Sequence, residues 1–132
     1  MASIFVRLKA REGMEQEAER LMKQMYEDTH RYEPKCHRYE YWRGQTPGSY
    51  YMVFSATDYL GYLDHAAAGY HTKTDWNAVY EVIENEWVDP VPGANDAVPT
   101  ETMPVPSDID EAKKAASQRH VHVVKKPDWW GR

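Results

Sequence analysis

The chain has a single cysteine, Cys36, and no long run of apolar residues. One cysteine excludes an internal disulfide and a metal cluster built from cysteines alone. The longest apolar runs fall far short of the roughly 20 residues that cross a bilayer. Arg7 and Lys9 interrupt the first apolar stretch, so we expect no signal peptide, no membrane partner and a cytoplasmic location. Sixteen Lys and Arg stand against 21 Asp and Glu, which argues against nucleic acid as a partner.

Several common catalytic motifs are also missing. The sequence contains no G-x-S-x-G, no P-loop and no G-x-G-x-x-G, so a standard serine hydrolase or a nucleotide-binding protein has no support. Phenylalanine is scarce, with two residues, but there are ten Tyr and five Trp. That balance is typical of a half-wet pocket or a subunit interface. A small domain that places tyrosines at its edges is an equally good interpretation.

Proline divides the chain of 132 residues into two parts. Five of the eight prolines lie between residues 89 and 107, where they exclude a helix or a central strand. We therefore predict a domain over residues 1–90, followed over residues 91–132 by a proline-rich linker and a C-terminal extension. The extension contains a short helix capped by Ser107 or Asp108. It ends in Trp129 and Trp130, which we expect to be docked because two adjacent exposed tryptophans are costly.

The first part begins with a strand and a helix. Ile4, Val6 and Leu8 alternate with Phe5, Arg7 and Lys9, which predicts a half-buried strand. Apolar residues then recur at helical spacing and predict a helix over residues 12–31. Pro34 ends this helix.

The rest of this part predicts a hairpin, helical pieces and a last strand. Residues 36–45 and 49–56 are rich in strand formers and flank a Thr-Pro-Gly turn. Helical segments follow from a cap at Thr57 or Asp58 and break near Gly69. A short strand over residues 86–88 completes a β-α-β-β-α-β order. The predicted fold is α+β, with an antiparallel sheet and helices on one face. The uncovered face is too apolar for water, which predicts a homodimer with two sheets face to face and the proline segment across the partner subunit.

The order of these motifs over residues 2–90 resembles the antibiotic biosynthesis monooxygenase family of the dimeric α+β barrel superfamily. Pro34 and Cys36 match the turn before the second strand, where Lys35 replaces the usual glycine. His65 and His71 match two histidines of the second helix. The resemblance implies a ferredoxin-like monomer, a homodimer and a pocket between sheet and helices. It also implies oxygenation of phenols or quinols without a cofactor. Haem-degrading relatives use an asparagine on the first strand, and its absence here argues against that activity.

The candidate catalytic residues are His71, His65 and Tyr62. A neutral imidazole takes a proton from a phenol or from a carbon beside a carbonyl. A purely structural role for His65 is a competing interpretation. Tyr62 lies three residues before His65, so both fall on one helix face. Tyr62 and His71 also resemble the Tyr and His pair of plant polyketide cyclases in the same superfamily.

Further residues are candidates for binding a small aromatic substrate. An arginine among aromatics holds a phenolate or a carboxylate, and the candidates for these roles are Arg43, Tyr41, Tyr39, Trp76 and Asn77. Which face of the second strand lines the pocket stays open, because a shift of one residue inverts it.

A metal site is a weaker alternative. His120 and His122 form an H-x-H that places both rings on one face of a strand, but a third ligand would be needed. We expect no metal and no cofactor, and we interpret Cys36 as a buried apolar residue.

Three functions therefore remain. The first is a cofactor-independent monooxygenase of a phenolic, quinol or polyketide-like compound. The second is an isomerase, cyclase or lyase that works by proton transfer through a Tyr/His pair without oxygen. The third is a small-molecule-binding protein without catalysis.

Overall fold

Apolar residues alternate along the first strand and recur at helical spacing in the segment after it, and the computed structural model contains both elements. It describes residues 1–88, 91, 93–94 and 106–119. The predicted C-terminal histidine pair and tryptophan pair, and most of the proline-rich segment, lie outside the described residues. Within the described part of the chain, no helix has the length and apolar character needed to cross a membrane.

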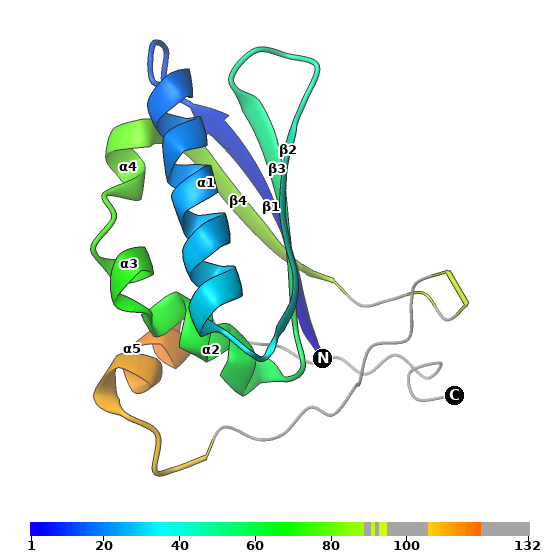
Figure 1. Ribbon diagram of the computed structural model, residues 1–132, viewed down its shortest axis with the longest axis vertical. Coiled ribbons are helices and arrows are strands. Elements are labelled where there is room, and N and C mark those ends of the chain that lie inside the picture. Colours follow the sequence, from blue (N-terminus) through cyan, green and yellow to red (C-terminus); the bar gives the residue numbers. More distant parts are fainter. Residues whose placement is uncertain (89–90, 92, 95–105, 120–132) are drawn as a thin grey trace.

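The sheet has four strands, and its helices lie on one side (Figure 1). The strands are β1 (Ala2–Ala10), β2 (Cys36–Arg43), β3 (Ser49–Ala56) and β4 (Tyr80–Val88), and the helices are α1 (Glu15–Tyr32), α2 (Tyr59–Ala67), α3 (Gly69–Thr72), α4 (Trp76–Val79) and α5 (Glu111–Arg119). The order across the sheet is β2-β3-β1-β4, and every neighbouring pair is antiparallel. The α+β prediction with an antiparallel β-α-β-β-α-β sheet is therefore confirmed.

The inner face of the sheet packs against the helices. Ile4, Val6 and Leu8 of β1 point to this side and are buried. Helix α1 covers part of the face with the apolar positions that its spacing predicted, namely Ala18, Leu21, Met22 and Met25. The helix ends at Tyr32, and its C-cap residue Glu33 lies directly before Pro34, because the residue before a proline avoids the helical region.

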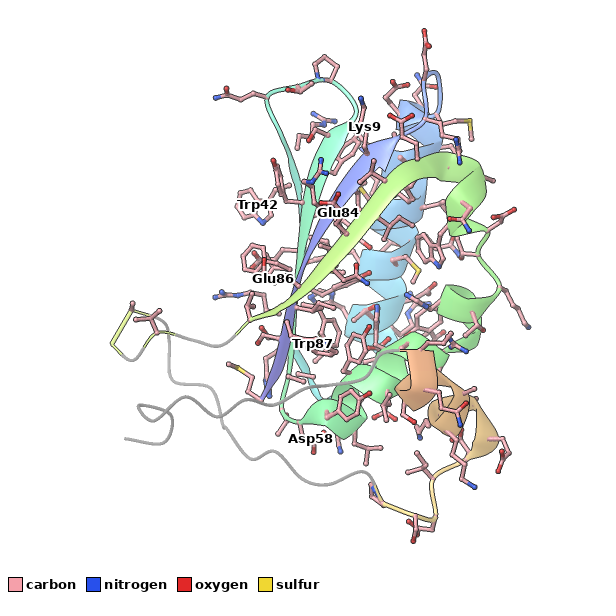
Figure 2. All side chains as sticks on the ribbon, turned by 180° about the vertical axis from the view of Figure 1, so that it is seen from behind. Lys9, Trp42, Asp58, Glu84, Glu86 and Trp87 are labelled. Atoms are coloured by element: carbon pink, nitrogen blue, oxygen red, sulfur yellow. The ribbon has the colours of Figure 1, made fainter. Side chains whose placement is uncertain are left out.

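The structure decides which face of β2 points inward. Tyr39 lies opposite the fully buried Phe54 of β3 and is 2% exposed. Tyr41 and Arg43 share this face with Tyr39, because side chains alternate along a strand. Trp42 points to the opposite face and is 60% exposed. Figure 2 shows Trp42 projecting from the sheet on the side away from the helices.

The last strand is longer than the sequence predicted. We expected helix almost to Glu86 and a strand over residues 86–88, but β4 begins at Tyr80 and pairs with β1 from Ala10 to Ser3. The sequence over residues 80–88 fits both a helix and a strand, and the free edge of β1 decides between them by supplying a ladder of hydrogen bonds. The break in the helical segment near Gly69 is confirmed, since α2 ends at Ala67 and α3 begins at Gly69.

The N-terminal caps of α2 and α5 can be compared with the caps that the sequence predicted. Asp58 caps α2, because its carboxylate accepts a hydrogen bond from the Gly61 amide at 2.7 Å. The predicted caps of the C-terminal helix, Ser107 and Asp108, are wrong. Asp110 takes this position, and its carboxylate accepts from the Lys113 amide at 2.9 Å.

Gly61 allows α2 to lie close to the ends of β2 and β3. A Cβ atom at this position would lie 2.9 Å from Cβ of Lys35 and 3.0 Å from Cβ of Ala56, whereas a Cβ at Gly69 would meet nothing within 4 Å. We expect Gly61→Ala to lower the free energy of unfolding by about 1–3 kcal/mol, because the added methyl group overpacks the contact. Gly69→Ala should leave it unchanged or raise it by up to about 1 kcal/mol.

Urea denaturation followed by tryptophan fluorescence measures both variants. Equal stability of Gly61→Ala and the wild type would show that α2 does not need this close approach.

Candidate active site

A cavity of about 370 Å³ lies between the inner face of the sheet and helices α2 to α4. This volume is in the range of small-molecule sites. The sheet supplies an apolar floor, which includes Ile4, Val6, Leu8, Met52 and Ile83. The polar lining residues come from both layers: Tyr39, Tyr41 and Asn85 from strands, and Tyr62, His65, His71, Thr72, Trp76 and Arg119 from helices and the turn at their ends.

The structure gathers most of the predicted site residues around this cavity. Tyr39, Tyr41, Tyr62, His65, His71 and Trp76 all line it. Arg43 and Asn77 do not. Asn77 is exposed, and its main-chain carbonyl oxygen accepts a hydrogen bond from Nε of Arg11 at 2.7 Å. The roles of the gathered residues stay predictions.

His65 is held by a carboxylate from the end of α1. Its ring is 3% exposed, and Nδ1 lies 3.0 Å and 3.1 Å from the two carboxylate oxygens of Glu33. An ionised carboxylate only accepts hydrogen bonds, so the pairing places the hydrogen of a neutral imidazole on Nδ1. Within the described residues, Nδ1 is the only side-chain atom of His65 for which a hydrogen bond is found. The lone pair on Nε2 is thus the basic side of the ring.

Glu33 is itself surrounded by donors. The hydroxyl of Tyr70 donates to Oε1 of Glu33 in a short hydrogen bond, and Oγ1 of Thr29 lies 3.5 Å from the same oxygen. Glu33 is 8% exposed. A buried carboxylate is costly unless it is hydrogen-bonded, and these donors together with His65 meet that need. The arrangement is a buried Glu-His pair whose imidazole faces a cavity.

Aromatic rings surround the two histidines. The rings of His65 and His71 have centroids 5.0 Å apart, and the His71 ring lies 5.2 Å from that of Trp76. Trp76 is positioned by a hydrogen bond from its Nε1 to the carbonyl oxygen of His71 at 3.2 Å. Tyr39 and Phe54 contact His65 from the sheet side. The histidines therefore belong to one cluster at the wall of the cavity.

The tyrosines of the cavity are neutral donors. The hydroxyls of Tyr39 and Tyr41 lie 2.5 Å apart. Burial raises the pKa of Tyr41 to about 12 and also raises the pKa values of Tyr39 and Tyr62. A protonated Tyr62 hydroxyl donates a hydrogen bond to a carbonyl or phenolate oxygen. Burial likewise raises the pKa of the Cys36 thiol to about 12, which suits an unreactive cysteine.

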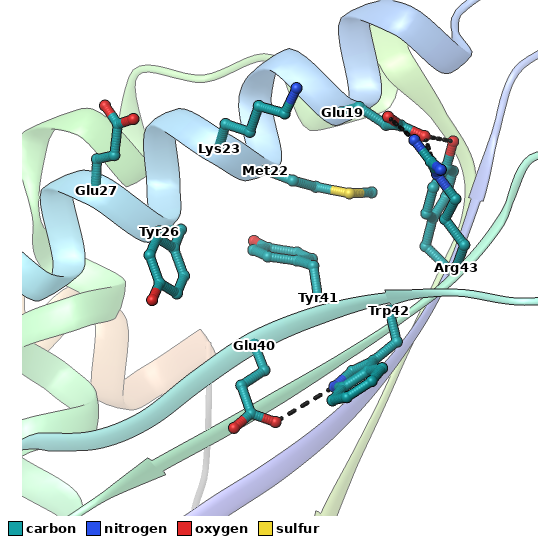
Figure 3. A pocket seen from close by; sticks show the side chains of 10 residues that line it. Glu19, Met22, Lys23, Tyr26, Glu27, Glu40, Tyr41, Trp42 and Arg43 are labelled. Carbon is teal, nitrogen blue, oxygen red and sulfur yellow. Dashed lines mark hydrogen bonds and ion pairs between the residues drawn. The ribbon is translucent and has the colours of Figure 1, made fainter.

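A second hollow of about 420 Å³ lies on the outside of the molecule, between α1 and β2 (Figure 3). Arg43 lies here, where its guanidinium donates two hydrogen bonds of 2.6 Å to the carboxylate of Glu19. The Tyr50 hydroxyl donates to the same carboxylate at 3.1 Å. No histidine lines this hollow. Because Glu19 neutralises Arg43 and no histidine of the described residues is present, the hollow is a weaker candidate for an active site than the cavity of the two histidines.

The described part of the chain contains no group of three or more His, Cys, Asp or Glu side chains placed to hold a metal ion. The H-x-H alternative, His120 and His122, lies outside the described residues.

Sequence reasoning missed several residues that the structure places at the cavity. Glu33 is 32 positions from His65, and only its place beside Pro34 in the matched turn could have drawn attention to it. Arg119 lies at the end of α5, and no sequence motif pointed to it. Asn85 was assigned to the end of a helix, so its position on the inner face of β4 was hidden.

Comparison with known proteins gives a structural match only. No protein-family model and no curated protein matches the sequence. A solved structure named antibiotic biosynthesis monooxygenase matches with a TM-score of 0.63 and 22% identity, over 70% of this chain and 100% of that one. Rv0793 from Mycobacterium tuberculosis matches with a TM-score of 0.64 and 13% identity, over 71% and 98% of the chains.

A third match carries a functional name. It is a variant of SnoaB, a cofactor-independent oxygenase from Streptomyces nogalater, with a TM-score of 0.59 and 17% identity over 67% of this chain and 91% of that one. This chain is therefore longer than the fold that it shares with these proteins. At these identities the likeness concerns the fold. The chain has the fold of proteins named antibiotic biosynthesis monooxygenases, as the sequence motifs predicted.

Proposed function

We propose that the protein is a cofactor-independent monooxygenase of a small phenol or quinol, with His65 as the general base. The observation that carries this proposal is the buried Glu33–His65 pair beside a cavity of suitable size. Nδ1 is fixed as the donor to Glu33, so Nε2 is the atom that accepts the substrate proton. Tyr62 and His71 line the same cavity and supply hydrogen bonds to oxygen atoms of the substrate.

The proposed reaction needs no external reductant. Nε2 of His65 removes the phenol proton, and the electron-rich phenolate reacts with O2 at its para carbon to give a hydroperoxide. The hydroperoxide then loses water, with the para C–H hydrogen removed in the same elimination. One oxygen atom becomes the second carbonyl of a quinone and the other leaves in water. The substrate supplies all four electrons, so the balance is phenol plus O2 to quinone plus water.

The same residues support a second candidate, which is proton transfer without oxygen. Burial raises the pKa of Tyr62, so its hydroxyl stays protonated and donates to a substrate carbonyl. His71 or His65 then removes a proton from the neighbouring carbon. An isomerase, cyclase or lyase of a polyketide-like compound would use this arrangement. Binding without turnover is the third candidate.

Turnover in air and without oxygen separates these candidates. The substrates are catechols, naphthols, anthrones and polyketide-like diketones, with a chelator present and no cofactor added. We expect product in air alone, with one O2 consumed for each quinone. Product under both conditions would replace the oxygenase with the proton-transfer enzyme. Binding of these compounds by calorimetry without any product would favour the third candidate.

We further propose that the protein is a homodimer through the outer face of its sheet. Phe5, Trp42 and Tyr51 lie on this face and are 46%, 60% and 42% exposed, and an apolar patch of this kind marks an interaction site. A second copy offers the same patch around a two-fold axis.

We expect the wild type to have twice the 15.4 kDa chain mass by light scattering. Phe5→Arg should have the mass of one chain, because it buries an unpaired charge in the interface. Tyr26→Arg is the matched control, since Tyr26 is also 46% exposed but lies on α1. A monomeric wild type, or a dimeric Phe5→Arg, would contradict the proposed interface.

A further inference from the structure

Helix α5, which comes after the proline-rich segment in the sequence, brings a charge to the candidate active site. It follows the last strand and packs against α2, the helix that carries Tyr62 and His65 (Figure 1). Ala116 is fully buried in this contact region, and Nζ of Lys113 lies 3.0 Å from the carboxylate of Asp64 on α2. These contacts hold the end of α5, where Arg119 lies, at the cavity.

Among the described residues that line the cavity, Arg119 alone carries a permanent charge. The other residues that line it are apolar, neutral polar or histidine. Within the described residues, no carboxylate lies within ion-pair distance of Arg119, in contrast to Arg43, Arg7 and Arg20, each of which pairs with a glutamate. The guanidinium also acts on Tyr62, because its positive charge opposes the rise in the pKa of that hydroxyl. Arg119 therefore lies near the Tyr62 side of the cavity, and no carboxylate of the described residues compensates its charge.

We propose that Arg119 binds a carboxylate of the substrate, so that the site prefers phenolic carboxylic acids to neutral phenols. A guanidinium donates two parallel hydrogen bonds to a carboxylate. Tyr62 and His65 lie on one face of α2, about one helical turn apart. A substrate bound along this face has its phenol at His65 and its carboxylate at Arg119, on the Tyr62 side. This inference rests on the proposed use of the cavity as the substrate site.

The preference is measured with two ligands of nearly equal shape. One is 6-hydroxy-2-naphthoate and the other is its neutral carboxamide. Isothermal titration calorimetry at low salt gives the dissociation constant of each with the full chain. We expect the wild type to bind the acid about tenfold more tightly than the amide. This ratio corresponds to the lower end of the free energy that a hydrogen bond to a charged group contributes. The ratio should fall when salt is raised, because ions screen a partly exposed charge.

Variants on α5 test whether Arg119 is the source of this preference. Arg119→Gln removes the charge and should bring the ratio close to one with little change for the amide. Arg119→Lys should keep part of the preference. Lys114→Gln is the matched control on the same helix, because Lys114 pairs with Glu111 and does not line the cavity. Its ratio should equal that of the wild type.

Two results would overturn the inference alone. One is equal binding of acid and amide by the wild type, and the other is an unchanged preference in Arg119→Gln; in both, binding of the amide leaves the proposed function intact. Failure of both ligands to bind at millimolar concentration would overturn the proposed substrate site and this inference with it.

Discussion

His65→Asn should lower kcat for a phenol substrate by about 10²–10⁴-fold, the usual contribution of a general base. The imidazole is buried, and its Nδ1 is occupied by Glu33. Asparagine keeps an amide that can bond to Glu33 but has no basic nitrogen. Steady-state oxygen consumption with the substrate found by the aerobic screen measures the loss. Circular dichroism checks that the variant is folded.

Two further histidine variants make the result specific. His37→Asn is the control, because His37 is exposed on β2 and bonds to Thr57 at 2.6 Å, away from the cavity. It should retain wild-type activity. His71→Asn should have the smaller effect of a residue that orients the substrate. If His65→Asn stays active while His71→Asn does not, the base is His71 and the role given to Glu33 is wrong.

Glu33→Gln should lower kcat by about 100-fold while the binding of a phenol changes little. Glutamine is nearly isosteric with glutamate, but its amide can donate to Nδ1, which would move the hydrogen of the imidazole to Nε2. Nε2 would then no longer accept a proton. Loss of a carboxylate that orients a catalytic imidazole commonly costs 10- to 100-fold or more.

The comparison of kcat with binding separates orientation from structure. A Glu33 that only stabilised the fold would alter thermal stability and the affinity for 2-naphthol, measured by calorimetry, as much as it altered turnover. Glu27→Gln is the control at an exposed position of α1, and its kcat should be unchanged. Wild-type turnover by Glu33→Gln would show that the Glu-His pair does not set the basic nitrogen.

The sequence was sufficient to predict those elements in which the spacing of apolar residues fits only a strand or only a helix. The alternation of Ile4, Val6 and Leu8 predicted β1, and the spacing of Ala18, Leu21 and Met25 predicted the buried face of α1. It was not sufficient for β4, because residues 80–88 fit either period and only pairing with β1 selects the strand. Local patterns therefore fail where a distant segment decides the outcome.

The same distinction between local and distant contacts explains which residues of the candidate site could be predicted. His65 and His71 were found because they match two histidines of the family that the sequence resembles, and Tyr62 because it lies three residues before His65. Glu33 was missed because only the fold brings the end of α1 to α2. Alternation left open which face of β2 lines the cavity, and it could not show that Glu19 of α1 pairs with Arg43 outside the cavity. A charge pair between distant elements leaves no local signal in a single sequence.

Helix α2 lies between the sheet and helix α5. One side of α2 faces the sheet, and Asp64 on its other side holds α5 through Lys113. A ligand that contacts Arg119 binds only the form in which α5 is docked. Ligand binding and docking of α5 are then linked equilibria, and a ligand at 100 times its dissociation constant would stabilise the docked form by about 2.7 kcal/mol. Amide hydrogen exchange in α5 would slow in proportion, so that the C-terminal helix reports the occupancy of the cavity.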